Sequence, residues 1–496
     1  MTNQEHDVII IGAGISGIGM AYWLKKKCPT KSFALLEGRS KIGGTWSLFK
    51  YPGVRSDSDM FTFGYRFKPW KEPQSLSSGD NILAYLEETV QENNIDEHIL
   101  FNHKMLSANW SDESATWVLK VETPNGNEQL QCKFLSICSG YYDYKEAHRP
   151  HFEGEEHFQG KTIIPQFWPK NLDYKDKEIV IIGSGATAVT LVPSLVEGGA
   201  KHVTMVQRSP TYIMNLPNRN QLFIFLKKYF PFLWAYRATR WMNILLQMTS
   251  FNLSKIFPKW MKKVLMKAAA KQLPEGYPVD KHFNPTYNPW DQRLCVVPDG
   301  DLFQVIKDGK ASIATDEILN FTEHGVRLKS EETISADLIV LATGLKIQLL
   351  GGASISINGV PVNVNQSMIY KGMMVSSVPN LIYAFGYTNA SWTLKVDLTA
   401  NYLCKLLNHM DKKGYDVVVP EKEELSSDES FLNLNSGYIE RAKDILPKQG
   451  SRRPWRVFQS YLLDMLATRF GSIPDNVLKF TKNQPAEEFV DEKLSK

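Results

Sequence analysis

The chain has 496 residues, a formal net charge of +4 and 43% hydrophobic residues, which is enough for two or three domains with large cores. The small positive charge gives no basis for nucleic-acid binding. Because no run of about 20 apolar residues occurs, we expect no transmembrane segment.

The five cysteines are scattered, and no two of them have the spacing of a metal site or a redox pair. They are Cys28, Cys132, Cys138, Cys295 and Cys404. We therefore expect no bound metal and free thiols in a reducing cytosol. The first strand is expected to begin at Asp7 or Val8, with no signal peptide before it.

A glycine-rich loop follows the first predicted strand. Val8 to Ile11 are branched apolar residues, Gly12-Ala13-Gly14-Ile15-Ser16-Gly17 follows, and a helix is predicted over 17–27. A second strand over 32–37 ends at Glu37, twenty residues after Gly17. This spacing is typical of a dinucleotide site, in which the loop receives the pyrophosphate and the acid binds ribose hydroxyls. The alternative is a tight turn that needs glycine only for its backbone angles.

A second loop of the same kind lies about 170 residues later. A strand predicted over 178–182 precedes Gly183-Ser184-Gly185-Ala186-Thr187-Ala188, and the next strand ends at Gln207. Arg208 and Ser209 stand where an acid would bind NADH, and a guanidinium there can bind a 2′-phosphate. The second loop therefore predicts NADPH, unless Arg208 is merely a surface residue in a salt bridge.

Two such loops predict an α/β fold with two Rossmann-like dinucleotide-binding domains, the second inserted in the first, plus a helical insert. A linker runs from about 141 to 161, and strands within 323–344 are expected to return the chain to the first domain. The predicted boundaries are 1–145 with 341–496 for the first domain, 146–215 with 291–340 for the second, and 216–290 for the insert.

Residues 219–271 contain eleven Lys or Arg, eleven aromatic residues and no Asp or Glu. The pattern predicts basic amphipathic helices. The favoured interpretation is a helical insert whose aromatic residues face a core and whose lysines face solvent. The alternative is peripheral contact with an anionic membrane, or a gate for lipophilic substrates.

Four motifs carry a family resemblance. They are Gly43-Gly44-Thr45-Trp46, Tyr51-Pro52-Gly53-Val54-Arg55-Ser56-Asp57, Asn288-Pro289-Trp290-Asp291-Gln292-Arg293-Leu294-Cys295 and Phe385-Gly386-Tyr387-Thr388-Asn389-Ala390-Ser391-Trp392. The chain resembles the Baeyer–Villiger, or class B flavin, monooxygenases over nearly its whole length. It is most similar to the subgroup of the ethionamide-activating and long-chain alkane monooxygenases.

This resemblance implies FAD in the first domain and NADPH in the second. FAD contacts are implied at Ser16, Glu37, Thr45, Trp46, Asp57 and Met105, and NADPH contacts at Arg55, Ser184, Gly185, Ala186, Thr187, Ala188, Val189, Thr190, Arg208 and Ser209. Further cofactor-binding positions are Gly12, Gly14, Gly17, Gly44, Ser47, Leu48 and Gly183.

The resemblance also places Arg293 over the flavin, oriented by Asp57. A permanent cation there would stabilise an oxygen-derived anion and the oxyanion of an attacked carbonyl. The alternative is a structural ion pair. The expected activity inserts one atom of O2 into lipophilic ketones to give esters, and oxidises sulfides or thioamides.

One position departs from the family's linker fingerprint. Phe158, Gly160 and Trp168 are in register, but Ile164 occupies the position of a histidine, and isoleucine cannot form hydrogen bonds through its side chain. His148, His151 and His157 are out of register and are expected on a solvated linker.

The alternatives are an enzyme limited to sulfur and nitrogen oxygenation, a flavin disulfide reductase, and an uncoupled NADPH oxidase or membrane-surface protein. The reductase would need a close cysteine pair, which the sequence lacks.

Overall fold

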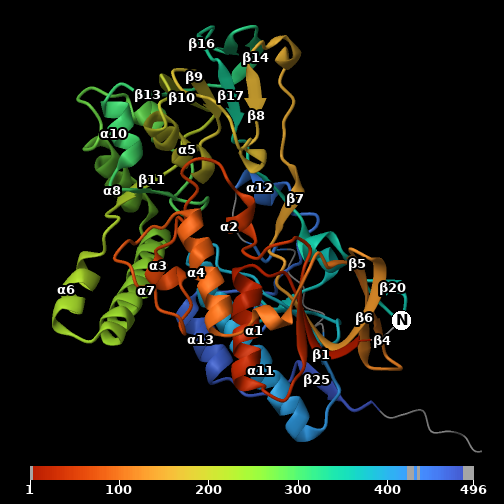
Figure 1. The fold of residues 1–496 in the computed structure, drawn as a ribbon. Coiled ribbons are helices and arrows are strands. Elements are labelled where there is room, and N and C mark those ends of the chain that lie inside the picture. The colour runs from red at the N-terminus through yellow and green to blue at the C-terminus, as the bar shows by residue number, and fades with distance from the viewer. Residues whose placement is uncertain (1–3, 422–428, 433–435, 484–496) are drawn as a thin grey trace, which may run out of the picture.

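The protein, seen here in a computed structural model, is described over residues 4–421, 429–432 and 436–483. Figure 1 shows two sheet-containing domains, one above the other, with α6, α7 and α8 at the side. The α/β class with two Rossmann-like domains, the second inserted in the first, is confirmed. Residues 1–3, 422–428, 433–435 and 484–496 of the predicted first domain lie outside the described residues.

The first domain is built on a mixed sheet of nine strands in the order β20-β19-β4-β5-β6-β1-β2-β3, with β23 also paired to β6. Val8 and Ile10 of β1 face one core, which includes residues of α1, α4 and α11, whereas Ile9 and Ile11 face another. This two-sided burial explains the continuous apolar run. The elements are β1 (Gln4–Ile11), α1 (Ile15–Lys27), β2 (Phe33–Glu37), α2 (Thr45–Leu48), α3 (Met60–Phe63), α4 (Gly79–Glu92), β3 (Ile99–Phe101), β4 (Lys104–Ser111), β5 (Thr116–Thr123), β6 (Gly126–Ile137), β19 (Ser354–Ile357), β20 (Val360–Pro361), β23 (Leu381–Tyr383) and α11 (Trp392–Lys413).

The second domain has a five-stranded parallel sheet in the order β13-β10-β9-β17-β8. Ile179 and Ile181 of β9 face one core, and Val180 and Ile182 face the other, as in β1. The strands predicted over 178–182 and 202–207 are confirmed. The elements are β8 (Lys161–Ile163), β9 (Glu178–Ile182), α5 (Ala186–Glu197), β10 (His202–Gln207), β11 (Ile213–Leu216), β12 (Cys295–Pro298), α10 (Asp301–Lys307), β13 (Ala311–Thr315), β14 (Ile318–Thr322), β15 (Gly325–Leu328), β16 (Thr333–Ser335) and β17 (Leu338–Leu341).

A two-stranded ribbon joins the domains. β7 (Tyr142–Ala147) pairs with β18 (Leu345–Ile347), so the chain leaves and re-enters the first domain at one place. The start of the predicted linker is corrected to a strand, β7. β17 pairs with β9 and β8 in the second sheet, and the chain then returns to the first domain along β18.

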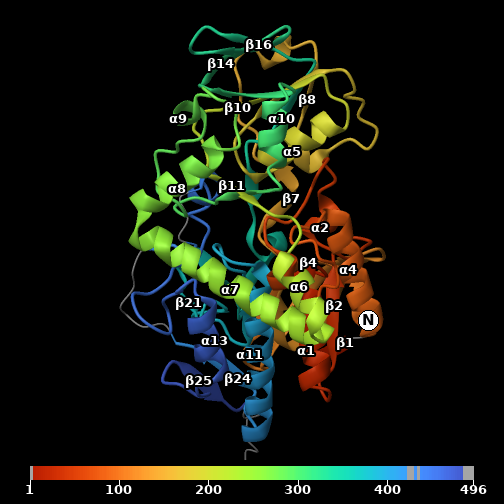
Figure 2. The same cartoon turned by 90° about the vertical axis from the view of Figure 1, so that its left-hand side faces the viewer.

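The insert consists of α6 (Gln221–Tyr229), α7 (Phe232–Ile256), α8 (Pro258–Ala270) and α9 (Val279–His282). In Figure 2 the first three cross the face turned toward the viewer. The favoured interpretation of their aromatic residues is wrong for most of them, because no further layer of the described chain covers the outer side of α6–α8. C-terminal elements are β21 (Ile369–Tyr370), β22 (Met374–Val375), β24 (Val417–Pro420), α12 (Gly437–Glu440), α13 (Tyr461–Arg469) and β25 (Leu478–Thr481).

Candidate active site between the two domains

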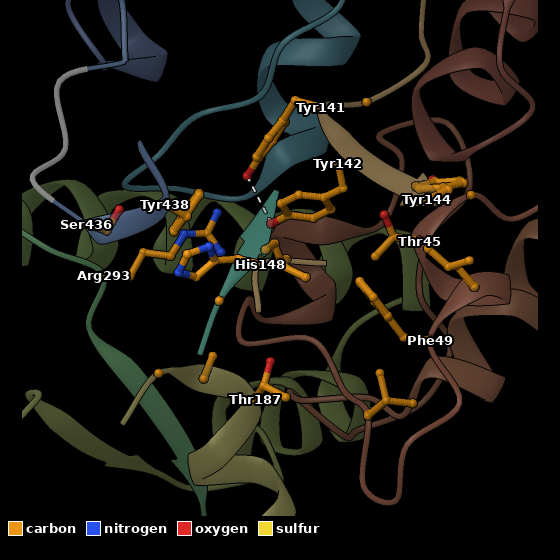
Figure 3. A pocket seen from close by; sticks show the side chains of 18 of the residues that line it. Thr45, Phe49, Tyr141, Tyr142, Tyr144, His148, Thr187, Arg293, Ser436 and Tyr438 are labelled. Carbon is orange, nitrogen blue, oxygen red and sulfur yellow. Dashed lines mark hydrogen bonds between the residues drawn. The ribbon is translucent and has the colours of Figure 1, made fainter. Parts of the chain in front are cut away.

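A cavity of about 1290 Å³ lies between the domains and connects both glycine-rich loops. Figure 3 shows side chains from several segments around it, among them Thr45 at the start of α2 and Thr187 in the second loop. Twenty of the predicted site residues line the cavity: Gly12, Gly14, Ser16, Glu37, Gly44, Thr45, Trp46, Leu48, Arg55, Asp57, Met105, Gly183, Ser184, Gly185, Ala186, Thr187, Thr190, Arg208, Ser209 and Arg293. The fold therefore gathers residues from across the chain at one hollow.

The first loop needs its glycines for close backbone packing. A Cβ on Gly12, whose φ is +100°, would lie 2.8 Å from the carbonyl oxygen of Cys138, and one on Gly17 would lie 1.9 Å from that of Gly12. Glu37 at the end of β2 accepts hydrogen bonds from the amides of Ala13 at 2.9 Å and Arg39 at 3.0 Å. The carboxylate thereby fixes the loop and still borders the cavity.

The second loop repeats this geometry. A Cβ on Gly183, whose φ is +130°, would lie 2.3 Å from the carbonyl oxygen of Ala342 on the adjoining chain segment. Gly185 differs, because no described atom lies within 4 Å of the position its Cβ would take. The backbone before α5 is therefore exposed to open space, as a site for a phosphate at a helix N-terminus requires.

Arg208 lies at the end of β10, exposed and at the edge of the cavity. The Oγ of Ser184 donates a hydrogen bond to the carbonyl of Ser209 at 3.1 Å, which holds this turn against the second loop. Glu317 is nearby, and its pKa is lowered chiefly by the hydrogen bond from Lys329 and to a smaller extent by Arg208. Arg208 has no ion pair within 4 Å among the described residues, and it lines the cavity.

The segment 51–57 connects the first domain to two helices of the second domain, α5 and α10. A Cβ on Gly53, where φ is +75°, would lie 1.8 Å from the Oγ of Ser194 on α5, so only glycine allows this approach. Two residues later, Arg55 Nη1 lies 2.6 Å from Asp301 Oδ2 on α10. This packing positions Asp57 at the cavity.

Arg293 reaches the cavity from the loop before β12. Its Nη1 lies 3.6 Å from Asp57 Oδ2, which is an ion pair but longer than a hydrogen bond. The pKa of Arg293 is raised well above its usual value, chiefly by Tyr438 and also by Tyr141 and Asp57, against the opposing effect of burial. The side chain is about one-third exposed, and that exposed part faces the cavity.

The phenols beside Arg293 are uncharged near neutral pH. Burial raises the pKa of Tyr141 far above its usual value and that of Tyr142 to about 12. Their hydroxyls lie 3.2 Å apart, drawn as the dashed line in Figure 3. They can donate or accept hydrogen bonds, while Arg293 supplies the positive charge.

Sequence reasoning missed several cavity residues. Arg39 lies with its guanidinium 5.1 Å from the ring centroid of Tyr144 and donates to the carbonyl of Gly44 at 2.9 Å. Because Arg39 follows Glu37 by two residues, the sequence could have indicated that it lies near the cofactor site. Arg441, which follows α12, also lines the cavity, but nothing in its sequence surroundings indicates this.

One prediction about the histidines is wrong. His148 lines the cavity, and Figure 3 shows its ring and Arg293 pointing toward the same part of it. Burial, with a smaller effect from Arg441, lowers the pKa of His148, so its ring is uncharged near neutral pH. His151 and His157 are exposed, as expected of a solvated linker.

Four predicted cofactor-binding residues lie outside the cavity lining. Gly17 packs on the Gly12 carbonyl, and Ser47 accepts a hydrogen bond from Arg39 at 2.7 Å. Ala188 and Val189 are buried in the core beneath α5. Ile164 is also absent from the lining and packs against the apolar core on the other side of the second sheet.

Cys138 and Cys295 both line the cavity, and burial raises the pKa of each thiol to about 12. Protonated, buried thiols are poor nucleophiles. All five cysteines are free and buried among the described residues. The cavity therefore lacks the reactive thiol pair of a disulfide reductase.

The cavity fits two phosphate-bearing coenzymes. Nη2 of Arg55 and Nε of Arg293 are buried and have no hydrogen-bond partner among the described residues. Unsatisfied buried donors are costly, so a bound acceptor is expected at such positions. Together with the open space at Gly185, these donors match anionic ligands in the cavity.

Comparison with known proteins gives relatives over nearly the full chain. It is 51% identical over 484 residues to the FAD-containing monooxygenase EthA of Mycolicibacterium smegmatis, covering 97% of this chain and 98% of that protein. It is 50% identical over 483 residues to the probable FAD-binding monooxygenase AlmA of Acinetobacter baylyi, covering 97% of both.

Residues 9–215 match the family described as pyridine nucleotide-disulphide oxidoreductase. Among solved structures, an oxidized steroid monooxygenase bound to NADP is similar with a TM-score of 0.76 at 18% identity, over 97% of this chain and 100% of that one. An open cyclohexanone monooxygenase is similar with a TM-score of 0.74 at 17% identity, over the same shares. At these identities the structural likeness supports the fold.

Proposed function

Because this chain belongs to the FAD-containing monooxygenases, we propose that it uses NADPH and O2 to insert one oxygen atom beside the carbonyl of lipophilic ketones, giving esters, and to oxidise sulfides and thioamides. The observation that carries this proposal is Arg293, a permanent cation with an unpartnered Nε among the described residues, in the cavity that joins both loops. Such a group stabilises an oxyanion without transferring a proton.

FAD would be held by the first loop with Glu37 and by the segment from Gly44 to Leu48, and NADPH by the second loop with Arg55 and Arg208. When bound, the two coenzymes supply the electrons and the activated oxygen. The similarity to a steroid monooxygenase bound to NADP supports this pairing. Donors of Arg55 and Arg208 would bind phosphate groups and fix the nucleotide against α5.

Arg293 would bind the oxygen that becomes negative when a ketone carbonyl is attacked. Asp57, at ion-pair distance, limits how far the guanidinium can move. Tyr141 and Tyr142 add uncharged hydroxyls, and the Phe49 and Trp392 rings that line the cavity help to exclude water. A lipophilic substrate suits these aromatic walls.

The test is the variant Arg293→Ala, assayed with a ketone and a sulfide under NADPH and air. Removing one oxyanion-stabilising group costs about 2.7–4 kcal/mol of barrier, so kcat on the ketone should fall roughly 100- to 1000-fold. Sulfide oxidation, which builds no carbonyl oxyanion, should fall far less. If Arg293→Ala retains both activities equally, this arginine does not stabilise the carbonyl oxyanion and the argument for Baeyer–Villiger oxidation fails; a wild type that oxidises the sulfide and not the ketone would be limited to sulfur and nitrogen oxygenation.

A second candidate is an NADPH oxidase that releases reduced oxygen instead of product. Ile164 favours it, because this side chain packs into the apolar core and offers no hydrogen bond to the cavity or to a coenzyme. The ratio of product formed to NADPH consumed separates the two functions. A ratio near zero with every substrate class would identify the oxidase.

A further inference from the structure

Large apolar side chains gather on the outer side of α6, α7 and α8. Of 23 exposed large apolar residues in the described chain, 14 lie within 224–264. They are Ile224, Phe225, Tyr229, Phe230, Leu233, Trp234, Trp241, Met242, Leu245, Leu246, Ile256, Phe257, Trp260 and Val264, here called the insert face together with the basic residues among them. So dense a concentration marks an interaction surface.

The charges of the insert face have one sign. Ten of the eleven Lys and Arg residues in 219–271 are exposed or half-buried, and the segment holds no acid. Lys255 forms an ion pair at 2.8 Å with Asp291, which lies outside this segment. Lys259, Lys263 and Lys267 have no ion pair among the described residues. Apolar and aromatic side chains therefore lie among largely uncompensated positive charges.

The inner side of α7 fixes this orientation. Arg240 is buried and donates to the carbonyl oxygens of Phe61 at 2.6 Å and Gly64 at 2.8 Å. The amide of Asn243 donates to Asp59 at 2.8 Å. The opposite side, with Trp234, Trp241 and Leu245, is thereby held outward. Its exposure follows from how the helix is anchored.

We propose that the insert face docks on the surface of a membrane rich in anionic phospholipids. Basic amphipathic helices lie in the plane of the interface, with aromatic and aliphatic side chains below the headgroups and lysines beside the phosphates. In the described residues no helix is long and apolar enough to cross a bilayer, so contact is peripheral. A second copy fits less well, because a symmetric contact would oppose two faces of the same charge.

Docking would place lipid beside the loop that carries Arg293. The ring of Phe251 on α7 lies 5.7 Å from that of Trp290, and Lys255 binds Asp291 on the same loop. Arg293 follows two residues later. Lipophilic compounds dissolved in the bilayer would then be concentrated beside the cavity. The docking itself does not depend on the proposed oxygenation.

The first experiment uses the full-length FAD-loaded protein and needs no variant. It is floated with vesicles of phosphatidylcholine alone and with vesicles that also contain phosphatidylglycerol, at low and high salt. We expect flotation with the anionic vesicles that weakens as salt rises, since screening reduces charge attraction. Brominated acyl chains should quench tryptophan fluorescence in the anionic vesicles only, because Trp234, Trp241 and Trp260 would lie near the chains.

Two pairs of variants test the contributions of the lysines and of the apolar side chains to vesicle binding. The double variant Lys259→Gln/Lys263→Gln should bind anionic vesicles about 25-fold more weakly, at roughly fivefold per basic residue near the surface. Its control, Lys120→Gln/Lys310→Gln, removes two exposed lysines elsewhere and should bind as before. Leu246→Ser, at a residue 59% exposed, should weaken binding about tenfold, and Val360→Ser, at a residue 68% exposed, should not.

The proposal is overturned if wild-type protein does not float with anionic vesicles. It is also overturned if each control variant loses as much vesicle binding as the insert-face variant to which it is matched. It is also overturned if size-exclusion chromatography shows a stable oligomer that Leu246→Ser converts to monomer while neither form binds vesicles, because the face then contacts a second copy. If the wild-type protein floats with anionic vesicles but oxidises no ketone, the proposed function is contradicted and the proposed docking is not.

Discussion

The two glycines of the second loop differ in what an added methyl group would meet, and this difference can test the nucleotide site. Gly185 has φ −77° and ψ 179°, which any residue adopts, and no described atom lies within 4 Å of the place that a methyl group on its Cα would occupy. Gly185→Ala should therefore change the free energy of unfolding by no more than about 0.5 kcal/mol.

The same methyl group would occupy the space in front of α5 where a pyrophosphate is expected. Displacing one charged hydrogen bond costs about 1.5–3 kcal/mol, so the Kd for NADPH should rise roughly 10- to 140-fold. Isothermal titration with NADPH and calorimetric unfolding of the same preparation measure both quantities. The FAD content should stay unchanged, because the first loop is untouched.

Gly183→Ala is the matched control. Its φ is +130°, and its Cβ would lie 2.3 Å from the Ala342 carbonyl oxygen. This variant should therefore lose affinity for NADPH and also lose about 1–3 kcal/mol of free energy of unfolding through backbone strain. If Gly185→Ala binds NADPH as tightly as the wild type, the open space is not the nucleotide site. If it unfolds as easily as Gly183→Ala, the space beside Gly185 is not open.

Three further predictions concern selectivity, coupling and pH. Arg208→Ala should raise the KM for NADPH roughly 10- to 100-fold and leave that for NADH nearly unchanged, since only NADPH carries the 2′-phosphate; equal effects on both coenzymes would contradict the assignment. Ile164→His should raise the product formed per NADPH consumed, measured by mass spectrometry beside an NADPH assay, and an unchanged ratio would show that this position does not control coupling. Burial lowers the pKa of His282 below its usual value near 6.5. The unfolded chain therefore binds a proton at this histidine more readily than the folded chain does. As pH falls below about 6.5, this difference lowers the free energy of unfolding, and above that pH it has no effect. His282→Gln should therefore make the unfolding temperature fall less steeply between about pH 6.5 and 5, and an identical slope would show that this histidine does not contribute.

Much of the fold could be predicted because its signals are local. The runs before Gly12 and Gly183 alternate between two cores, so both strands had to be continuous apolar stretches, and the loops after them are packed too tightly for any side chain at these two glycines. The family resemblance is confirmed by relatives at about half identity over nearly the whole chain. The roles of Arg293 and Asp57 stay predictions, although the structure brings them within 3.6 Å.

The features that could not be predicted depend on contacts distant in sequence. Tyr142 begins a strand only because Leu345–Ile347 returns beside it, and His148 reaches the cavity because that ribbon carries it there. Helical periodicity identified the amphipathic helices of the insert but could not tell a face covered by protein from one left bare. The contacts of α7 with the first domain, among them those of Arg240 with Phe61 and of Asn243 with Asp59, decide which side of the helix is outward.

The pairing of Leu345 with Ala147 has a consequence for how such a protein can be taken apart or assembled. Both ends of the inserted domain sit on adjacent strands, so its excision leaves a gap that a short turn can bridge without moving either neighbour. The inserted domain can thus be exchanged for another through a single junction. Chimeras cut at this ribbon are the natural route to hybrids with altered coenzyme preference.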